Sequence, residues 1–311
     1  MLSEPTFQSL AAQLGLSAPE MLVRLIEDGK TRYGSTHAEW RSSWRERLLN
    51  NPPALASCYD LEWIDAATSS EEMVAWLNTE VQYGFVFLPF AQNGAGDAYC
   101  LVAKAGAVDW LGVTMMEHDG SNFLVTATCF EDFVYTRLLE NLADFDHLKS
   151  DIFSVQEAHQ AVLADLRTML PYFPPERAAR IQGFAARPLM YSEVLYGKRL
   201  ETVPSVISQL EFETEMAFVK TIASDRFPMR ARWEVPGAED VLPEPTWQEL
   251  ALQEGERKAA IQLCKSVMKT GTADAMRIVT TFLIKYAEDP TQFQALNLSI
   301  HLRLRLSGIK H

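Results

Sequence analysis

The most informative part of the chain is residues 88–101, which read Leu88-Pro89-Phe90-Ala91-Gln92-Asn93-Gly94-Ala95-Gly96-Asp97-Ala98-Tyr99-Cys100-Leu101. It joins two short apolar runs, residues 85–90 and 99–103, through a cluster of Asn, Gly and Asp residues. Two apolar runs joined in this way predict a β-hairpin. The two glycines can adopt positive φ angles at no steric cost, and the Asn and Asp side chains can stabilise the turn through hydrogen bonds.

The sequence on both sides of this hairpin predicts further strands enclosed by helices. After it, two apolar runs with a turn at Asp119-Gly120-Ser121-Asn122 between them predict two more strands, and a phenylalanine-led segment predicts an amphipathic helix. Before it, the pattern predicts opening helices, one short strand and one helix. The predicted ranges are strands at 108–113, 123–127 and 59–64, and helices within 14–26, at 71–77 and at 129–139.

The residue pattern of the hairpin, a Pro-Phe-Ala start, a Gly-x-Gly-Asp turn and then Tyr-Cys-Leu, resembles the SUKH superfamily. The resemblance covers residues 1–150 and implies an α+β domain in which a mixed sheet has flanking helices. Many bacterial members are immunity proteins that bind and neutralise toxins, and no catalytic residue is carried over from the family. The chain departs from the family at Val102-Ala103, where an aspartate often stands, and in the long link over residues 31–56.

The second half of the chain predicts a separate, mainly α-helical domain over residues 151–311. Capping boxes at Ser154-x-x-Glu157 and Thr246-x-x-Glu249 predict helix starts, and residues 205–223 have helical spacing. Residues 232–235 predict a short strand. Residues 296–306 alternate strictly between apolar and polar, which favours a C-terminal strand, although the preceding Thr291-x-x-Gln294 box favours a helix.

The composition is that of a globular protein. The chain has 311 residues, 48% hydrophobic and 22% charged. No apolar run approaches the roughly 18–20 residues that span a bilayer, and the N-terminus lacks the pattern of a signal peptide. None of the four cysteines lies in a Cys-x-x-Cys pair, so we expect buried free thiols, a cytoplasmic location and no contact with a membrane.

The negative charge is concentrated in one segment. Residues 51–148 contain 15 acidic residues and only two basic ones, Lys104 and Arg137, which gives a formal charge of −13. Such a field attracts a basic partner and repels nucleic acid, although net negative charge also favours solubility alone. From charge and expected exposure we predict a partner-binding acidic surface. Its members are Asp97, Asp109, Glu117, Asp119, Glu131 and Asp132.

The sequence contains no recognisable motif for metal binding, phosphate binding or nucleophilic catalysis. The six histidines have no metal-binding spacing, and Gly94-Ala95-Gly96 is followed by neither a third glycine nor Gly-Lys-Ser/Thr. We therefore expect no metal, no cofactor and no catalytic residue.

Trp40, Trp44 and Leu48 recur at spacing four beside arginines. This pattern predicts either a nucleic-acid patch or an amphipathic helix that buries two indoles, and the acidic surroundings favour the helix.

Three functions remain open at this point. The resemblance and the charge favour an immunity protein that binds a cognate, basic protein toxin and occludes it without turnover. The alternative is a regulatory or scaffold adaptor that uses the SUKH-like domain for protein binding. An enzyme with a site between the two domains is the third hypothesis, and the absence of a recognisable motif argues against it only weakly.

Overall fold

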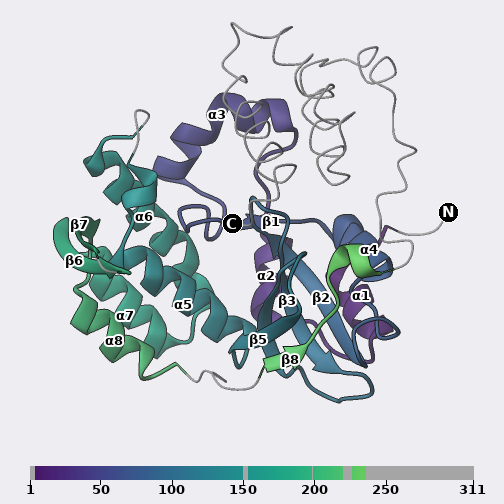
Figure 1. The fold of residues 1–311 in the computed structure, drawn as a ribbon. Coiled ribbons are helices and arrows are strands. Elements are labelled where there is room, and N and C mark those ends of the chain that lie inside the picture. The colour runs from purple at the N-terminus through teal and green to yellow at the C-terminus, as the bar shows by residue number, and fades with distance from the viewer. Residues whose placement is uncertain (1–3, 150–152, 198, 220–225, 236–311) are drawn as a thin grey trace, which may run out of the picture. The chain divides into compact units, whose positions relative to one another are not determined.

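The computed structural model describes residues 4–149, 153–197, 199–219 and 226–235 (Figure 1). These residues belong to one compact unit, Met1–Glu239, and the second unit, Asp240–His311, lies outside the described residues. The predictions made for the Thr246 capping box, for Cys264 and for the alternating segment 296–306 also fall outside them.

The described residues form eight α-helices, eight strands and three 3-10 turns. The α-helices are α1 (Phe7–Gln13), α2 (Glu20–Glu27), α3 (His37–Asn50), α4 (Ala66–Ala75), α5 (Phe130–Ala143), α6 (Val155–Met169), α7 (Pro175–Ala185) and α8 (Gln209–Met216). The strands are β1 (Glu62–Trp63), β2 (Phe85–Gln92), β3 (Ala98–Lys104), β4 (Gly112–Met116), β5 (Asn122–Ala127), β6 (Met190–Tyr196), β7 (Arg199–Ser205) and β8 (Arg226–Pro228). Three 3-10 turns complete them: η1 (Asp146–Leu148), η2 (Leu170–Tyr172) and η3 (Arg232–Glu234).

The centre of the fold is a six-stranded sheet in the order β1-β2-β3-β4-β5-β8. The α+β class is confirmed, but every strand pair described is antiparallel, so the expectation of a mixed sheet is wrong. The predicted hairpin is β2 and β3. Strand β4 begins at Gly112, four residues after the predicted start, because residues 105–111 form the connection from β3.

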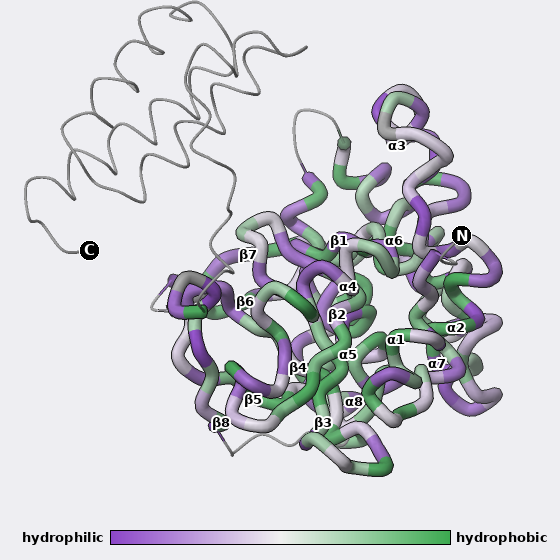
Figure 2. Tube along the Cα trace, turned by 90° about the vertical axis from the view of Figure 1, so that its right-hand side faces the viewer, coloured by the Kyte–Doolittle hydropathy of each residue, from purple (hydrophilic) through white to green (hydrophobic). Residues whose placement is uncertain are grey.

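Both faces of the sheet are covered, which explains why β2 and β3 are almost continuously apolar. Phe90 and Leu101 belong to the core formed with helices α1, α2 and α5, while Phe87 and Cys100 belong to a second core that includes Trp76. Strands buried on both faces lose the alternation of apolar and polar residues that marks a half-exposed sheet. Figure 2 shows hydrophobic stretches along the central strands and α5.

Strand β2 accommodates a proline because it is irregular at that point. The register shifts between Pro89 and Ala91, so that Phe90 bulges out of the pairing with β3. A proline has no N–H to donate and is tolerated in sheets mainly at edges and bulges. The carbonyl of Pro89 is used elsewhere and accepts a hydrogen bond of 2.6 Å from Ser69 Oγ on α4.

Residues beyond position 150 complete the same fold. Helices α6 and α7 pack on the core of α5, and β8 pairs with the edge of β5 (Figure 1). Met229 and Val235 join the core on the opposite face of the sheet. The boundary at residue 150 stays a prediction about independent folding, but the described residues on its two sides share their hydrophobic cores.

Two local predictions in this part of the chain differ from the structure. A helix is expected over residues 205–223, whereas Ser205 ends β7 of the β6–β7 hairpin and, within the described residues 205–219, the α-helix is Gln209–Met216. The 3-10 turn η3 stands where a strand was expected at 232–235. The predicted capping box that starts α6 at Ser154 is confirmed, with Glu157 N donating to Ser154 Oγ at 3.3 Å.

Candidate functional site

The turn between β2 and β3 is organised by the side chain of Asn93. Its Oδ1 accepts hydrogen bonds from the backbone amides of Ala95 (3.0 Å) and Asp97 (2.8 Å), and its Nδ2 donates to Asp97 Oδ2 (2.8 Å). Gly96 has a φ of +91°, a conformation that L-residues rarely adopt. The Asn-Gly-x-Gly-Asp sequence is therefore what the geometry of this turn requires.

Asp97 is one of the six predicted partner-binding residues, and the structure places it inside this network. It is 8% exposed, and its Oδ1 accepts hydrogen bonds from the backbone amide (3.0 Å) and the ring Nδ1 (2.6 Å) of His118. Burial alone would raise the pKa of Asp97, but the hydrogen bonds from His118 and Asn93 outweigh it and lower the pKa below its usual value. The exposure expected for Asp97 is wrong, because the carboxylate joins two turns.

Four exposed acidic groups lie at the end of the sheet that carries this turn. Asp60, Glu62, Glu117 and Asp119 are exposed, and we call these four residues the hairpin-end surface. The register places Glu62 opposite Gln92 and Met116 opposite Ala98, so β1 and the β4–β5 turn lie at the same end as the hairpin turn. Asp60 Oδ1 accepts a hydrogen bond of 2.7 Å from Gly94 N.

The other three predicted residues lie away from this surface. Asp109 is exposed in the β3–β4 connection, at the opposite end of the sheet. Asp132 is 6% exposed and, with Glu131, forms ion pairs with Arg177 of α7; the Arg177 Nη1 to Glu131 Oε1 distance is 3.0 Å. The exposure expected for Asp132 is wrong, and the pair Glu131–Asp132 ties α5 to α7. Glu117 and Asp119 are the predicted residues that the structure brings together on one exposed surface.

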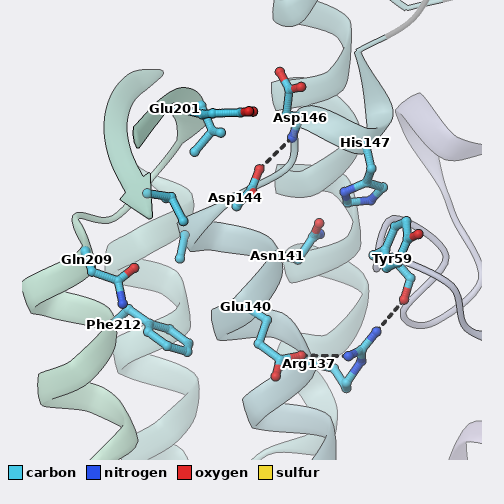
Figure 3. Close-up of a pocket in the computed structure, with 13 residues that line it drawn as sticks. Tyr59, Arg137, Glu140, Asn141, Asp144, Asp146, His147, Glu201, Gln209 and Phe212 are labelled. Carbon is cyan, nitrogen blue, oxygen red and sulfur yellow. Dashed lines mark hydrogen bonds and ion pairs between the residues drawn. The ribbon is translucent and has the colours of Figure 1, made fainter. Parts of the chain in front are cut away.

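A pocket of about 680 Å³ lies between α5, η1, the β6–β7 hairpin and α8 (Figure 3). Its charged and amide side chains come mainly from α5 and the residues after it. They are Arg137, Glu140, Asn141, Asp144, Asp146, Glu201 and Gln209. Arg137 Nη1 donates to Glu140 Oε2 at 2.7 Å, and Arg137 Nη2 donates to the carbonyl oxygen of Tyr59. Tyr59 precedes Asp60, so the pocket adjoins the hairpin-end surface along the chain.

A buried polar network supports one wall of the pocket. Asp165 of α6 is fully buried and accepts hydrogen bonds from Leu55 N (2.9 Å), Ser57 N (3.0 Å) and Ser57 Oγ (2.7 Å). Ser57 Oγ in turn accepts from Asn141 Nδ2 at 2.7 Å. Burial raises the pKa of Asp165 to about 6, because the hydrogen bonds only partly offset the loss of hydration.

His147 closes the pocket beside Tyr59. Its Nε2 donates to the carbonyl oxygen of Ser57 at 2.9 Å, and its ring lies edge-on to the Tyr59 ring at 5.3 Å. Burial lowers the pKa of His147, so the ring is held neutral at physiological pH.

The sequence analysis did not identify the residues of this buried polar network, Asp165, Ser57 and Asn141. Asp165 left a signal, since it interrupts the apolar face that Val162, Leu166 and Met169 define on a helix, and a carboxylate on such a face predicts a buried, hydrogen-bonded group. Ser57 and Asn141 left none, because an isolated serine and an isolated asparagine on a helix are common on any surface.

The Trp40 and Trp44 side chains are half-buried against aromatic neighbours, so the amphipathic-helix interpretation, which buries both indoles, is met only in part. Trp40 contacts the Tyr33 ring edge-on at 5.1 Å, and Trp44 contacts the Phe153 ring at 5.5 Å. Leu48 is buried in the same small core. The arginine beside Phe153, Arg45, forms an ion pair of 2.6 Å with Glu157 of α6. The aromatic-basic pattern of α3 is therefore explained by its packing against α6.

The described residues contain neither a cluster of metal ligands nor a helix that could cross a membrane. No group of three or more His, Cys, Asp or Glu side chains is placed to hold a metal ion there. Among the helices that the structure describes, none has the length and hydropathy needed to cross a membrane. Cys58 and Cys100 are buried free thiols, and burial raises their pKa values well above the usual range. Cys129 is exposed, so the expectation of a buried thiol is wrong at that position.

Comparison with known proteins gives no relative. The chain matches no protein-family model, no curated protein and no solved structure.

Proposed function

We propose that this protein is a non-catalytic binding protein of the immunity type, which uses the hairpin-end surface to bind a basic partner protein and cover its functional surface. The observation that carries the proposal is the concentration of four exposed carboxylates at one end of the sheet, within a segment of formal charge −13. Carboxylates grouped in this way attract a positively charged surface over several ångströms and raise the rate of encounter.

The backbone beneath these carboxylates is held in place before any partner arrives. The Asn93, Asp97 and His118 hydrogen bonds join the two turns, and Asp60 is held against Gly94. A surface that is already ordered loses little conformational entropy on binding, so more of the interaction energy appears as affinity. This rigidity supports a binding role for the hairpin end.

The order of elements supports the immunity type in particular. Opening helices, a short strand, a helix, the hairpin, two further strands and a closing helix follow one another in the order that the resemblance to the SUKH superfamily implies. A partner with a basic functional surface, such as a toxin that acts on nucleic acid, would meet carboxylates where its anionic substrate otherwise binds. Occlusion of this kind requires no reaction and acts at about one molecule per partner.

The test is association kinetics with a partner identified by pull-down and mass spectrometry from the host that carries the gene. Surface plasmon resonance over a series of salt concentrations should show association slowing as salt rises, since the Debye length falls to about 8 Å at physiological ionic strength. The double variant Glu117→Gln, Asp119→Asn should lower the association rate several-fold. Asp109→Asn, which changes another exposed carboxylate at the opposite end of the sheet, should leave it unchanged. Salt-independent association would contradict the proposal, as would protection of the partner's target at amounts far below equimolar.

A further inference from the structure

The loop that precedes β1, residues 54–60, runs through the interior and then presents two side chains to solvent. Residues 54–58 are buried or half-buried, whereas Tyr59 and Asp60 are exposed, with Tyr59 at 65%. Connecting segments normally lie on the surface, because their backbone polar groups need hydrogen-bond partners that water supplies there. A buried loop that ends in an exposed aromatic ring therefore calls for an explanation, and we call residues 54–60 the Tyr59 loop.

The backbone of the Tyr59 loop is strained on both sides of the tyrosine. Leu55 has a φ of +59° and Asp60 has a φ of +54°, both in the left-handed region. Aspartate adopts this conformation comparatively often, but it is an outlier for a bulky side chain such as that of Leu55, which is fully buried. Strained residues persist where the surrounding structure holds them, and such positions gather at functional sites. The strain at Leu55 thus points to a function for the loop that contains it.

Two titratable side chains hold the buried part of the loop from opposite sides. Asp165 of α6 accepts hydrogen bonds from Leu55 N at 2.9 Å and from Ser57 N at 3.0 Å, and His147 Nε2 donates to the carbonyl oxygen of Ser57 at 2.9 Å. Burial raises the pKa of Asp165 to about 6, so the ionised carboxylate is less stable here than in water. The fold therefore keeps a buried carboxylate at a cost in stability, and that carboxylate fixes the loop.

The exposed end of the loop is fixed as well. Arg137 Nη2 donates to the carbonyl oxygen of Tyr59 (Figure 3), and on the other side of the ring Asp60 Oδ1 accepts from Gly94 N at 2.7 Å. The His147 ring lies edge-on to the Tyr59 ring at 5.3 Å. A tyrosine that is ordered before binding offers a large contact area and loses little rotamer freedom when a partner covers it.

We propose that Tyr59 is the aromatic anchor of the partner interface, and that its ring packs against an apolar recess beside the basic groups of the partner protein. The inference rests on the proposed function and adds to it the residue that keeps the partner bound after encounter. Tyr59 directly precedes Asp60, which belongs to the hairpin-end surface, so the contact continues from the carboxylates onto the ring. The acidic segment around it, of formal charge −13, fits a partner whose recess is rimmed by lysine and arginine.

The ring and the carboxylates affect different rate constants. Exposed carboxylates act at a distance and mainly change the association rate. An uncharged ring acts only in the docked complex, so its removal mainly raises the dissociation rate. Tyrosine is also enriched among the residues whose truncation costs most of the affinity of an interface.

The experiment is surface plasmon resonance of the full-length protein with the purified partner protein captured from the host. Tyr59→Ala should raise the dissociation rate about tenfold or more and change the association rate by less than about twofold. Tyr59→Phe, which keeps the ring, should stay within about threefold of the wild type. The matched control is Tyr83→Ala, which should change neither rate. Tyr83 is 55% exposed and lies just before β2, at the end of the sheet opposite the hairpin turn.

A second measurement does not depend on the folding of a variant. N-acetylimidazole acetylates exposed tyrosines, and mass spectrometry identifies them in the wild-type protein. Binding of the partner should protect Tyr59 and leave Tyr83 reactive. Equal acetylation of Tyr59 in the free and bound protein would overturn the proposal.

The outcomes separate this inference from the proposed function. An unchanged dissociation rate for Tyr59→Ala, with association that still slows as salt rises, would overturn the role of Tyr59 and leave the proposed function standing. Faster dissociation of Tyr59→Ala with salt-independent association would support the anchor and contradict electrostatic steering by the hairpin-end surface.

Discussion

Asp97 holds His118 from two directions, through hydrogen bonds to its backbone amide (3.0 Å) and to its ring Nδ1 (2.6 Å). One carboxylate thereby joins the β2–β3 turn to the β4–β5 turn. The exposed acids Glu117 and Asp119 flank His118 in the sequence, so their positions depend on a contact that neither of them makes. The hairpin-end surface is built on a buried carboxylate.

The first prediction separates structural from exposed acids at this end of the sheet. Asp97→Asn should lower the free energy of unfolding by about 1–3 kcal/mol, because it weakens the hydrogen bonds to His118 and leaves polar groups poorly paired. Glu117→Gln should change it by less than about 0.5 kcal/mol, since the side chain is exposed. Urea denaturation of the two variants makes the comparison, and equal effects would show that Asp97 does not anchor the turns.

The second prediction contrasts two glycines with positive φ angles. Gly112 has a φ of +155°, and a Cβ placed there would lie 2.1 Å from the carbonyl oxygen of Ala127, so β4 and β5 approach too closely for any side chain. At Gly96, with a φ of +91°, a Cβ would meet nothing within 4 Å. Gly96→Val should therefore cost about 1–3 kcal/mol through backbone strain alone, whereas Gly112→Ala should cost more. Thermal melting ranks the two, and a Gly96→Val melting temperature equal to that of the wild type would show that its φ is not required.

The third prediction concerns the pH dependence of stability and comes from Asp165. Its pKa is raised by burial from 3.8 to about 6, so the folded state binds the proton more tightly than the unfolded state. The resulting stabilisation is at most roughly 3 kcal/mol. It is present below about pH 4 and is lost as the pH rises through about 6. Relative to Asp165→Asn, whose side chain does not titrate, the wild type should lose stability over this range.

The measurement is urea denaturation of both proteins from pH 4 to pH 7. If Asp165→Asn does not fold, the ¹³C chemical shift of the wild-type carboxyl gives its pKa directly. A midpoint near 4 would contradict the prediction, and so would a constant difference in stability between the two proteins.

The fourth prediction concerns where the folding unit ends. Fragment 1–150 lacks β8 and the buried side chains of Met229 and Val235, which cover the second face of the sheet. It also lacks α6, whose Asp165 holds the loop at Leu55–Ser57. Fragment 1–239 should unfold cooperatively, and fragment 1–150 should expose apolar surface and bind a hydrophobic dye. A stable, cooperative 1–150 fragment would instead establish the domain boundary that the sequence predicts.

The sheet and its flanking helices could be predicted from the sequence because the signals are local. Asn93 and Gly96 determine a turn by their own conformational preferences, and Ser154 with Glu157 determines a helix start. The β6–β7 hairpin was missed because its strands are exposed on one side and contain Pro204, so they resemble loop sequence. The β8 strand could not be predicted, since three residues pair with β5 only through contacts formed across the chain.

The candidate site could be predicted less well than the fold. Charge density located the acidic segment, but it could not distinguish Glu117, which is exposed, from Asp132, which is 6% exposed and paired with Arg177. Each has apolar residues on one side and another acidic residue within two positions, so the local sequence does not separate them. Which of them is exposed depends on whether a distant helix supplies an arginine, and composition contains no information on that.

Cross-linking of the captured complex shows whether the hairpin-end surface is the part of the protein that contacts the partner. A carbodiimide couples carboxylates to lysine amines only when the two groups are in contact, and mass spectrometry identifies the coupled residues. If the hairpin-end surface binds the partner, the partner's lysines are coupled to Asp60, Glu62, Glu117 and Asp119, and the couplings disappear at high salt. Couplings confined to other carboxylates, such as Asp109 at the opposite end of the sheet, would contradict it.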